Sequence, residues 1–340
     1  MVGNFEQKIS DEISNSIDNI NNEMLKVDKA SPITSLQFIL IILAVTLLCI
    51  FLANLKLIPP SGIGLGVLFS IGIPMVIISK YKDKKFAPVK KLINEFQSNL
   101  IKYINPELRY AQDDFVKKVL YYRSGIFTTT VDEYNGNSLI WGKMGQTNFM
   151  MSHLHTLVSG DNHSDTVFNG IFMVAEFNKK FNRKTLVLPD IAEKRYGSII
   201  GNWLQKISIR EEELVKLEDS EFEKRFVVYS TDQIEARYIL TPSLMDKLKV
   251  LNEKFNGIAV SFIDNRIFIA IPSSADTYFY LTYDMIIDKE EVLKSFEALK
   301  NMVDTGETII NELGLNNRIW TIDEDLFTEQ SSDYDKGSNS

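Results

Sequence analysis

Residues 258–272 read IAVSFIDNRIFIAIP, two apolar runs of strand-forming residues separated by Asp264 and Asn265. Both turn residues tolerate positive φ angles, so the pair suits the tight turn of a β-hairpin. Other β-rich runs begin near residues 125, 138, 147, 166, 184 and 225. Helical segments interrupt these strands without regular strand–helix alternation. The pattern therefore predicts an α+β fold with a mainly antiparallel sheet and several helices.

Helix signals flank this hairpin. Residues 230–238 begin with the S-x-x-Q form of a capping box, and residues 242–254 begin with a proline preceded by threonine, a cap followed by a first-turn proline. The last predicted helix covers 289–313, and another is expected over 190–205. These helices complete the predicted domain.

Two apolar stretches without charged residues lie near the N-terminus, LQFILIILAVTLLCIFLANL at 36–55 and SGIGLGVLFSIGIPMVIIS at 61–79. Twenty residues make about 30 Å of helix, the thickness of the hydrocarbon core of a bilayer. We therefore expect a transmembrane helical hairpin over 35–80. Gly62, Gly66 and Ser70 recur every fourth residue and would form its helix-packing stripe.

Lysines flank the outer ends of this hairpin more densely than its short loop. By the positive-inside rule, both termini would be cytoplasmic and the chain a two-span protein of the inner membrane. The predicted order along the chain is an amphipathic helix in 1–34, the hairpin in 35–80, a juxtamembrane basic segment and helix in 81–105, the cytoplasmic α+β domain in 106–322 and a disordered acidic tail in 323–340.

Composition excludes several classes of function. The 37 basic and 45 acidic side chains give a net charge of −8, which disfavours binding to the phosphates of nucleic acid. The single cysteine, Cys49, leaves no internal disulfide and no thiolate cluster for zinc. No cofactor is predicted.

The three histidines suggest the sharpest enzymatic hypothesis. His153 and His155 would share one face of a strand, and the following loop could add His163 or a carboxylate as a third metal ligand. A membrane-tethered hydrolase with a metal site at 153–163 is therefore an alternative. The spacing matches no established zinc signature, so the leading prediction has no metal and is not an enzyme.

Two polar motifs give candidate partner-binding residues. The first contains Asp232, Gln233, Glu235 and Arg237. Its two carboxylates would lie on neighbouring helical turns, where they could serve a partner or acid–base chemistry, although such charges also commonly favour a helix N-terminus. The second contains Arg318 and Trp320, types enriched at interface hot spots, although closing the final helix against the core is the favoured role of Trp320.

The stretches 168–181, 222–245, 258–272 and 312–320 resemble a bacterial family of membrane-anchored proteins, catalogued as a domain of unknown function and sometimes mislabelled "galanin". The block FEKRF…DQIEARYILTP is the most specific part. The resemblance implies an envelope context near LemA-type membrane proteins, and it supplies no catalytic residues. We therefore predict a membrane-anchored interaction module, a scaffold or sensor, whose partners are the lipid bilayer and another membrane protein, LemA-type by resemblance.

Overall fold

The structure is a computed structural model in which two compact units are distinguished. One unit comprises Met1–Phe96 with Leu281–Val292, and the other comprises Gln97–Tyr280 with Leu293–Ser340. The residues that the structure describes are 14–26, 43–44, 47, 51, 84–160, 164–177, 179–190, 213–273, 281 and 287–316.

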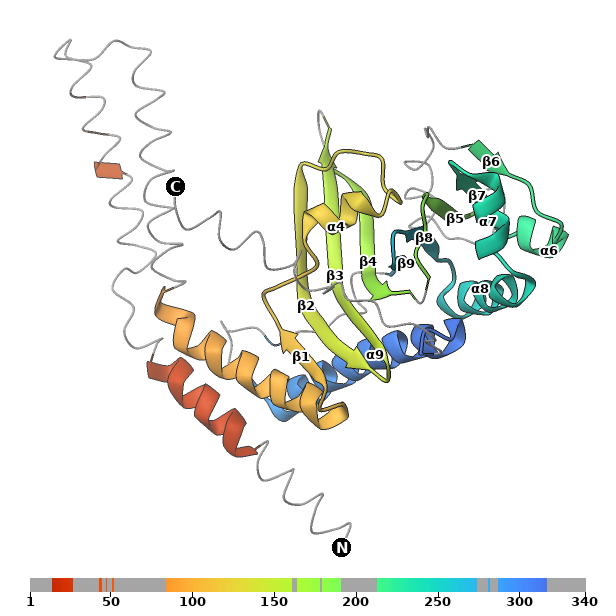
Figure 1. Ribbon diagram of the computed structural model, residues 1–340. Coiled ribbons are helices and arrows are strands. Elements are labelled where there is room, and N and C mark those ends of the chain that lie inside the picture. Colours follow the sequence, from red (N-terminus) through yellow and green to blue (C-terminus); the bar gives the residue numbers. More distant parts are fainter. Residues whose placement is uncertain are drawn as a thin grey trace, which may run out of the picture. The chain divides into compact units, whose positions relative to one another are not determined.

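The second unit is built on a nine-stranded sheet in the order β1-β2-β3-β4-β9-β8-β5-β7-β6 (Figure 1). Every pair of neighbouring strands is antiparallel, as the sequence pattern predicted. The strands are β1 (Leu108–Ala111), β2 (Glu133–Met144), β3 (Thr147–Ser159), β4 (Ser164–Glu176), β5 (Thr185–Pro189), β6 (Glu213–Val215), β7 (Phe226–Ser230), β8 (Ala259–Ile263) and β9 (Arg266–Pro272).

The predicted hairpin is confirmed as β8 and β9. Asp264 adopts a φ of 55°, the left-handed conformation that the tight turn requires. The chain after β4 rests on this turn, because the Phe177 amide donates to the Asn265 carbonyl at 2.7 Å. The strand expected near residue 125 is wrong: residues 125–131 lie outside the helices and strands, and the Phe127 ring stacks on that of Tyr121 with centroids 4.3 Å apart.

The capping residues and bounds of the helices can be compared with the sequence predictions. The cap of α7 is Asp232 rather than Ser230, whereas Thr241 and Pro242 start α8 as expected. The predictions over 242–254 and 289–313 are confirmed, and the one over 190–205 lies outside the described residues. The labelled helices are α4 (Lys118–Arg123), α6 (Ser220–Glu223), α7 (Gln233–Ile239), α8 (Pro242–Phe255) and α9 (Lys289–Leu313), and further helices cover 14–26 and 84–104.

Both faces of the sheet are covered by apolar side chains. Along β4 successive residues alternate between two clusters, so that Met173 belongs to one and Phe172 to the other. The first cluster includes Leu248 of α8 and Met302 of α9, and the second includes Tyr121 of α4. Burial on both faces explains why β4 has a continuous apolar run instead of alternating with polar residues.

In the first unit, Ile20 and Met24 are buried on the helix over 14–26. From the same helix the Asn21 amide bonds to the main chain of Ile287: its Nδ2 donates to the carbonyl at 2.8 Å, and its Oδ1 accepts from the amide at 2.9 Å. This reciprocal pair ties two segments of the unit that are distant in sequence.

The structure contradicts the predicted transmembrane hairpin over 35–80. Among the described residues, no helix is both long and apolar enough to cross a bilayer. Crossing needs about twenty apolar residues in one continuous helix. Of residues 35–80, only 43, 44, 47 and 51 are among those that the structure describes. The inferred two-span location in the inner membrane is corrected with it. Gly62, Gly66 and Ser70 lie outside the described residues.

Replacing Leu248 by alanine tests the packing of α8. Leu248 is fully buried, so Leu248→Ala should lower the free energy of unfolding by about 3 kcal/mol, measured by urea denaturation. Val250→Ala on the same helix is the control, because Val250 is 48% exposed and its loss should change stability by less than about 0.5 kcal/mol. Equal losses in the two variants would show that this face of α8 is not the packed one.

Candidate interaction surface on helices α7 and α8

Asp232 and Ser230 fix the start of α7. The Asp232 carboxylate accepts hydrogen bonds from the amides of Ile234 and Glu235 at 2.8 and 3.0 Å, which satisfies two donors at the helix N-terminus. The buried Ser230 hydroxyl accepts from the Asp232 amide at 3.1 Å and lies 2.9 Å from the Lys184 carbonyl. The helix therefore begins at a defined place beside strands β5 and β7.

Glu235 holds a neighbouring turn against α7. Its carboxylate accepts from the amides of Asn182 and Arg183 at 2.9 and 2.8 Å. A carboxylate with two amide donors is a strong, charge-assisted link, and here it joins residues more than fifty positions apart.

Arg237 and Gln233 tie the helix to the segment around β6. The Arg237 guanidinium donates to the carbonyls of Lys216 and Gln233, both at 3.1 Å, and the Gln233 amide reaches Glu213 at 3.5 Å. The predicted polar motif is thus engaged in contacts within the fold. The partner-binding role of its four residues stays a prediction.

The outward side of α7 carries large apolar side chains, which we call the α7 face. It consists of Ile234, 82% exposed, and Tyr238, 66% exposed. A spacing of four places both on one stripe of the helix. The inward residues Ala236 and Ile239 are buried. Lys179 lies beside this face, with its Nζ 4.5 Å from the centre of the Tyr238 ring, a cation–π contact.

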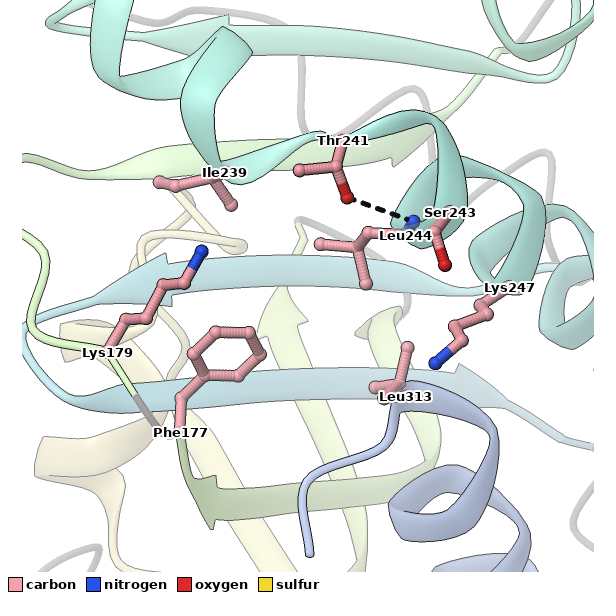
Figure 2. A pocket seen from close by; sticks show the side chains of 8 residues that line it. All are labelled: Phe177, Lys179, Ile239, Thr241, Ser243, Leu244, Lys247 and Leu313. Carbon is pink, nitrogen blue, oxygen red and sulfur yellow. Dashed lines mark hydrogen bonds between the residues drawn. The ribbon is translucent and has the colours of Figure 1, made fainter. Parts of the chain in front are cut away.

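A pocket of about 160 Å³ opens next to the α7 face (Figure 2). Its apolar wall comes from buried side chains of four segments, and Figure 2 shows Lys179 and Lys247 flanking it from opposite sides. The Thr241 hydroxyl at its edge accepts from the Leu244 amide at 3.3 Å as the cap of α8. The lining residues are Phe177, Lys179, Ile239, Thr241, Ser243, Leu244, Lys247 and Leu313.

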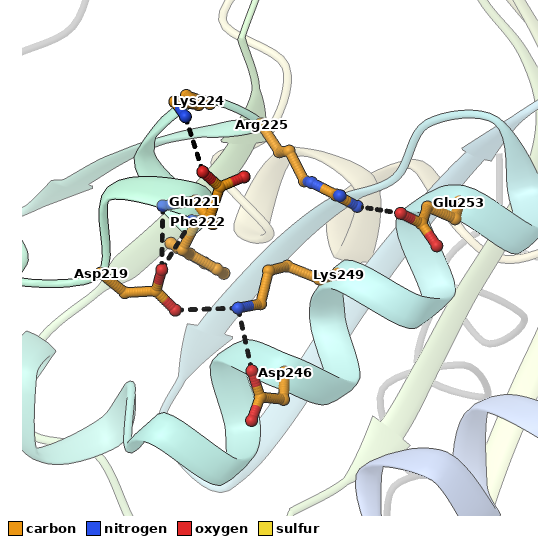
Figure 3. Close-up of polar contacts among 8 residues, drawn as sticks. All are labelled: Asp219, Glu221, Phe222, Lys224, Arg225, Asp246, Lys249 and Glu253. Atoms are coloured by element: carbon orange, nitrogen blue, oxygen red, sulfur yellow. Dashed lines mark hydrogen bonds and ion pairs between the residues drawn. The ribbon is translucent and has the colours of Figure 1, made fainter.

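Lys249 of α8 is a lysine whose ammonium group is paired with carboxylates. Lys249 bonds to Asp219 and Asp246, each at 2.9 Å (Figure 3). Its hydrogen bond lowers the pKa of the Asp219 carboxyl, which also caps α6. Lys247 differs: within the described part of the chain, no carboxylate forms an ion pair with it or with Lys179.

The structure describes two of the three histidines of the metal hypothesis. His153 is 8% exposed on β3, and its Nε2 lies 2.8 Å from Oδ1 of Asn169 on β4. Burial lowers the pKa of His153 to about 4, with the bond to Asn169 opposing the shift. The strand places His155 on the same face, while His163 lies outside the described residues. Among described side chains, no three His, Cys, Asp or Glu residues are grouped to hold a metal.

The second predicted motif, with Arg318 and Trp320, also lies outside the described residues. Sequence patterns alone do not identify the residues that form the candidate surface. Ile234 and Tyr238 lie inside the motif that was singled out for its charges. A search for apolar residues on both sides of that short helix could have found them, whereas the pocket lysines have no sequence signal of their own.

Comparison with known proteins gives a domain without an assigned function. A family described as "Protein of unknown function (DUF3137)" matches residues 166–315, which include α7, α8 and every residue that lines the pocket. The chain therefore contains a domain of unknown function. Neither the membrane anchoring nor the LemA link implied by the sequence resemblance follows from this match. No curated protein matches the chain.

One solved structure is similar in part, the crystal structure of the mycobacterial trehalose monomycolate transport factor A, TtfA. The identity is 8% and the TM-score 0.34, with 65% of this chain and 96% of that chain covered.

Removing the Glu235 carboxylate should loosen the turn that it holds. We expect Glu235→Ala to lower the free energy of unfolding by about 1–2 kcal/mol and to speed hydrogen exchange at the amides of Asn182 and Arg183. Glu235→Gln keeps one acceptor oxygen and should have a smaller effect on both. Unchanged exchange at the two amides in Glu235→Ala would contradict the proposed link.

Stability should depend on pH through His153. Between pH 6.5 and pH 4 the unfolded chain binds a proton at this imidazole that the folded chain does not. The neutral His153 therefore makes its full contribution to the free energy of unfolding above pH 6.5. This contribution is lost as the pH falls toward 4, by at most about 3 kcal/mol. Denaturant unfolding at several pH values should show a shallower dependence in His153→Gln than in the unmodified chain. If stability depended on pH equally in the two proteins, His153 would not be the source of the pH dependence.

Proposed function

We propose that this domain is a protein-interaction module, and that it receives a partner protein on the α7 face. The observation that carries the proposal is the exposure of Ile234 and Tyr238, 82% and 66%, one turn apart on a helix whose polar side chains are engaged within the fold. Neighbouring apolar side chains on a solvent-exposed surface favour a binding role, and tyrosine is among the residue types enriched at the hot spots of protein interfaces.

The hydrogen bonds that hold α7 in place favour recognition of a partner. Asp232, Glu235 and Arg237 bond the helix to the neighbouring turns, so its position is set before a partner arrives. A preorganised surface loses little conformational entropy on binding, which favours affinity. The chain's net charge of −8 makes nucleic acid a poor candidate for this partner. A LemA-type protein, expected from the sequence resemblance, stays a prediction.

The histidine segment does not favour the alternative hydrolase. His153 is buried, and its Nε2 is occupied by Asn169. The carboxylates of Asp232 and Glu235 are likewise engaged by backbone amides. We therefore propose no second function.

Photo-crosslinking in cells tests the proposal. The crosslinking amino acid benzoyl-phenylalanine is placed at Ile234, at Tyr238 or, as a control, at Val250, which is 48% exposed on α8. We expect one defined product from the first two positions that is absent from the third. The partner identified in that product is then purified. Its affinity for Tyr238→Ala should be at least about tenfold weaker, while stability changes little.

Two outcomes would overturn the proposal. One is a crosslinking pattern at Ile234 and Tyr238 that does not differ from the pattern at Val250. The other is a purified partner that binds Tyr238→Ala as tightly as it binds the unmodified domain.

A further inference from the structure

The pocket beside α7 combines an apolar wall with two cationic side chains. Phe177, Ile239, Leu244 and Leu313 are each at most 8% exposed, so the wall is part of the packed fold. Lys179 and Lys247 flank the opening from opposite sides (Figure 2). The pocket thus offers an apolar surface and positive charge to the same occupant.

The charges on the two lysines are not neutralised by the described residues. The chain has eight more acidic than basic side chains, and Lys249, two residues from Lys247, bonds to two carboxylates. Within the described ranges neither Lys179 nor Lys247 forms an ion pair, and the Lys179 ammonium lies over the ring of Tyr238. An occupant with a carboxylate would therefore find two available donors.

The volume limits the apolar part of that occupant. A cavity of about 150 Å³ is known to accommodate a benzene-sized group, and this pocket encloses about 160 Å³. One aliphatic or aromatic side chain fills this volume.

The pocket is continuous with the α7 face. Tyr238 belongs to the face, and the next residue, Ile239, lines the pocket. Lys179 contacts the Tyr238 ring and also lines the pocket. A chain that covers Tyr238 and Lys179 therefore lies next to the pocket.

We propose that the pocket anchors an acidic–apolar pair of residues in the bound partner protein. The large apolar side chain rests against Phe177 and Leu244, and the adjacent carboxylate accepts hydrogen bonds from Lys179 and Lys247. This inference rests on the proposed interaction function and adds the chemistry by which the partner is recognised.

Short peptides test the anchor without the partner. The probes are acetyl-Glu-Leu-amide and two matched controls, acetyl-Gln-Leu-amide without the charge and acetyl-Glu-Ser-amide without the apolar side chain. Binding to the full chain is followed by NMR shifts of the Leu244 and Leu313 methyl groups. We expect both controls to bind at least about fivefold more weakly than the Glu-Leu peptide.

Charge variants of the domain supply the second arm. Lys247→Gln should weaken binding of the Glu-Leu peptide at least about fivefold, and adding Lys179→Gln should weaken it further. Lys143→Gln on β2 removes the same charge at an exposed position away from the lining residues and should have no effect. Circular dichroism of each variant verifies that the fold is intact.

The outcomes separate this inference from the proposed function. Equal binding of the Glu-Leu and Gln-Leu peptides, or no effect of Lys247→Gln, would overturn the anchor. Tighter binding of 4-methylpentanoate than of the peptide would instead point to a free small acid and would also overturn it. If the crosslinked partner binds Lys247→Gln normally but Tyr238→Ala poorly, the interaction function stands and the anchor fails.

Discussion

The pairing of β4 with β9 is the constraint on which the sheet depends. It runs from Gly170 opposite Pro272 to Glu176 opposite Arg266, and it is the ladder that joins strands β1–β4 to the five strands β9-β8-β5-β7-β6. The two backbones approach closely at one end, since a Cβ on Gly170 would lie 2.1 Å from the Ile271 carbonyl oxygen. Glycine at this position is therefore a condition for the ladder, and both apolar clusters depend on the surface that it completes.

Local signals were sufficient for the elements that are specified within a few residues. The Asp264-Asn265 turn, the Thr241-Pro242 start of α8 and the apolar spacing of α9 each predicted the element that is found. Tertiary context decided the failure at 125–131. The run at 125–131 has strand-forming residues, yet Phe127 packs into the aromatic cluster around Tyr121 instead of joining a ladder. Apolar composition also predicts the membrane hairpin over 35–80, whereas no helix among the described residues, which include only 43, 44, 47 and 51 of that range, is long and apolar enough to span a bilayer.

The candidate site was harder to predict because it is assembled over long sequence distances. The motif around 232–237 was identified, but the sequence could not show that Glu235 bonds to Asn182 and Arg183. Its charged residues drew attention to the helix, whereas the exposed side chains between them carry the proposed interaction. The pocket joins residues from Phe177 to Leu313, and no spacing rule connects such positions.

The strand order has a consequence for synthesis of the chain. Strand β4 ends at Glu176, and its neighbour β9 begins only at Arg266. At about 5–20 residues per second, the ribosome needs roughly 5 to 20 seconds to make the intervening stretch. During that interval the nascent β1–β4 meander has an apolar strand with an unsatisfied edge, the kind of surface that chaperones shield and that aggregates when they do not.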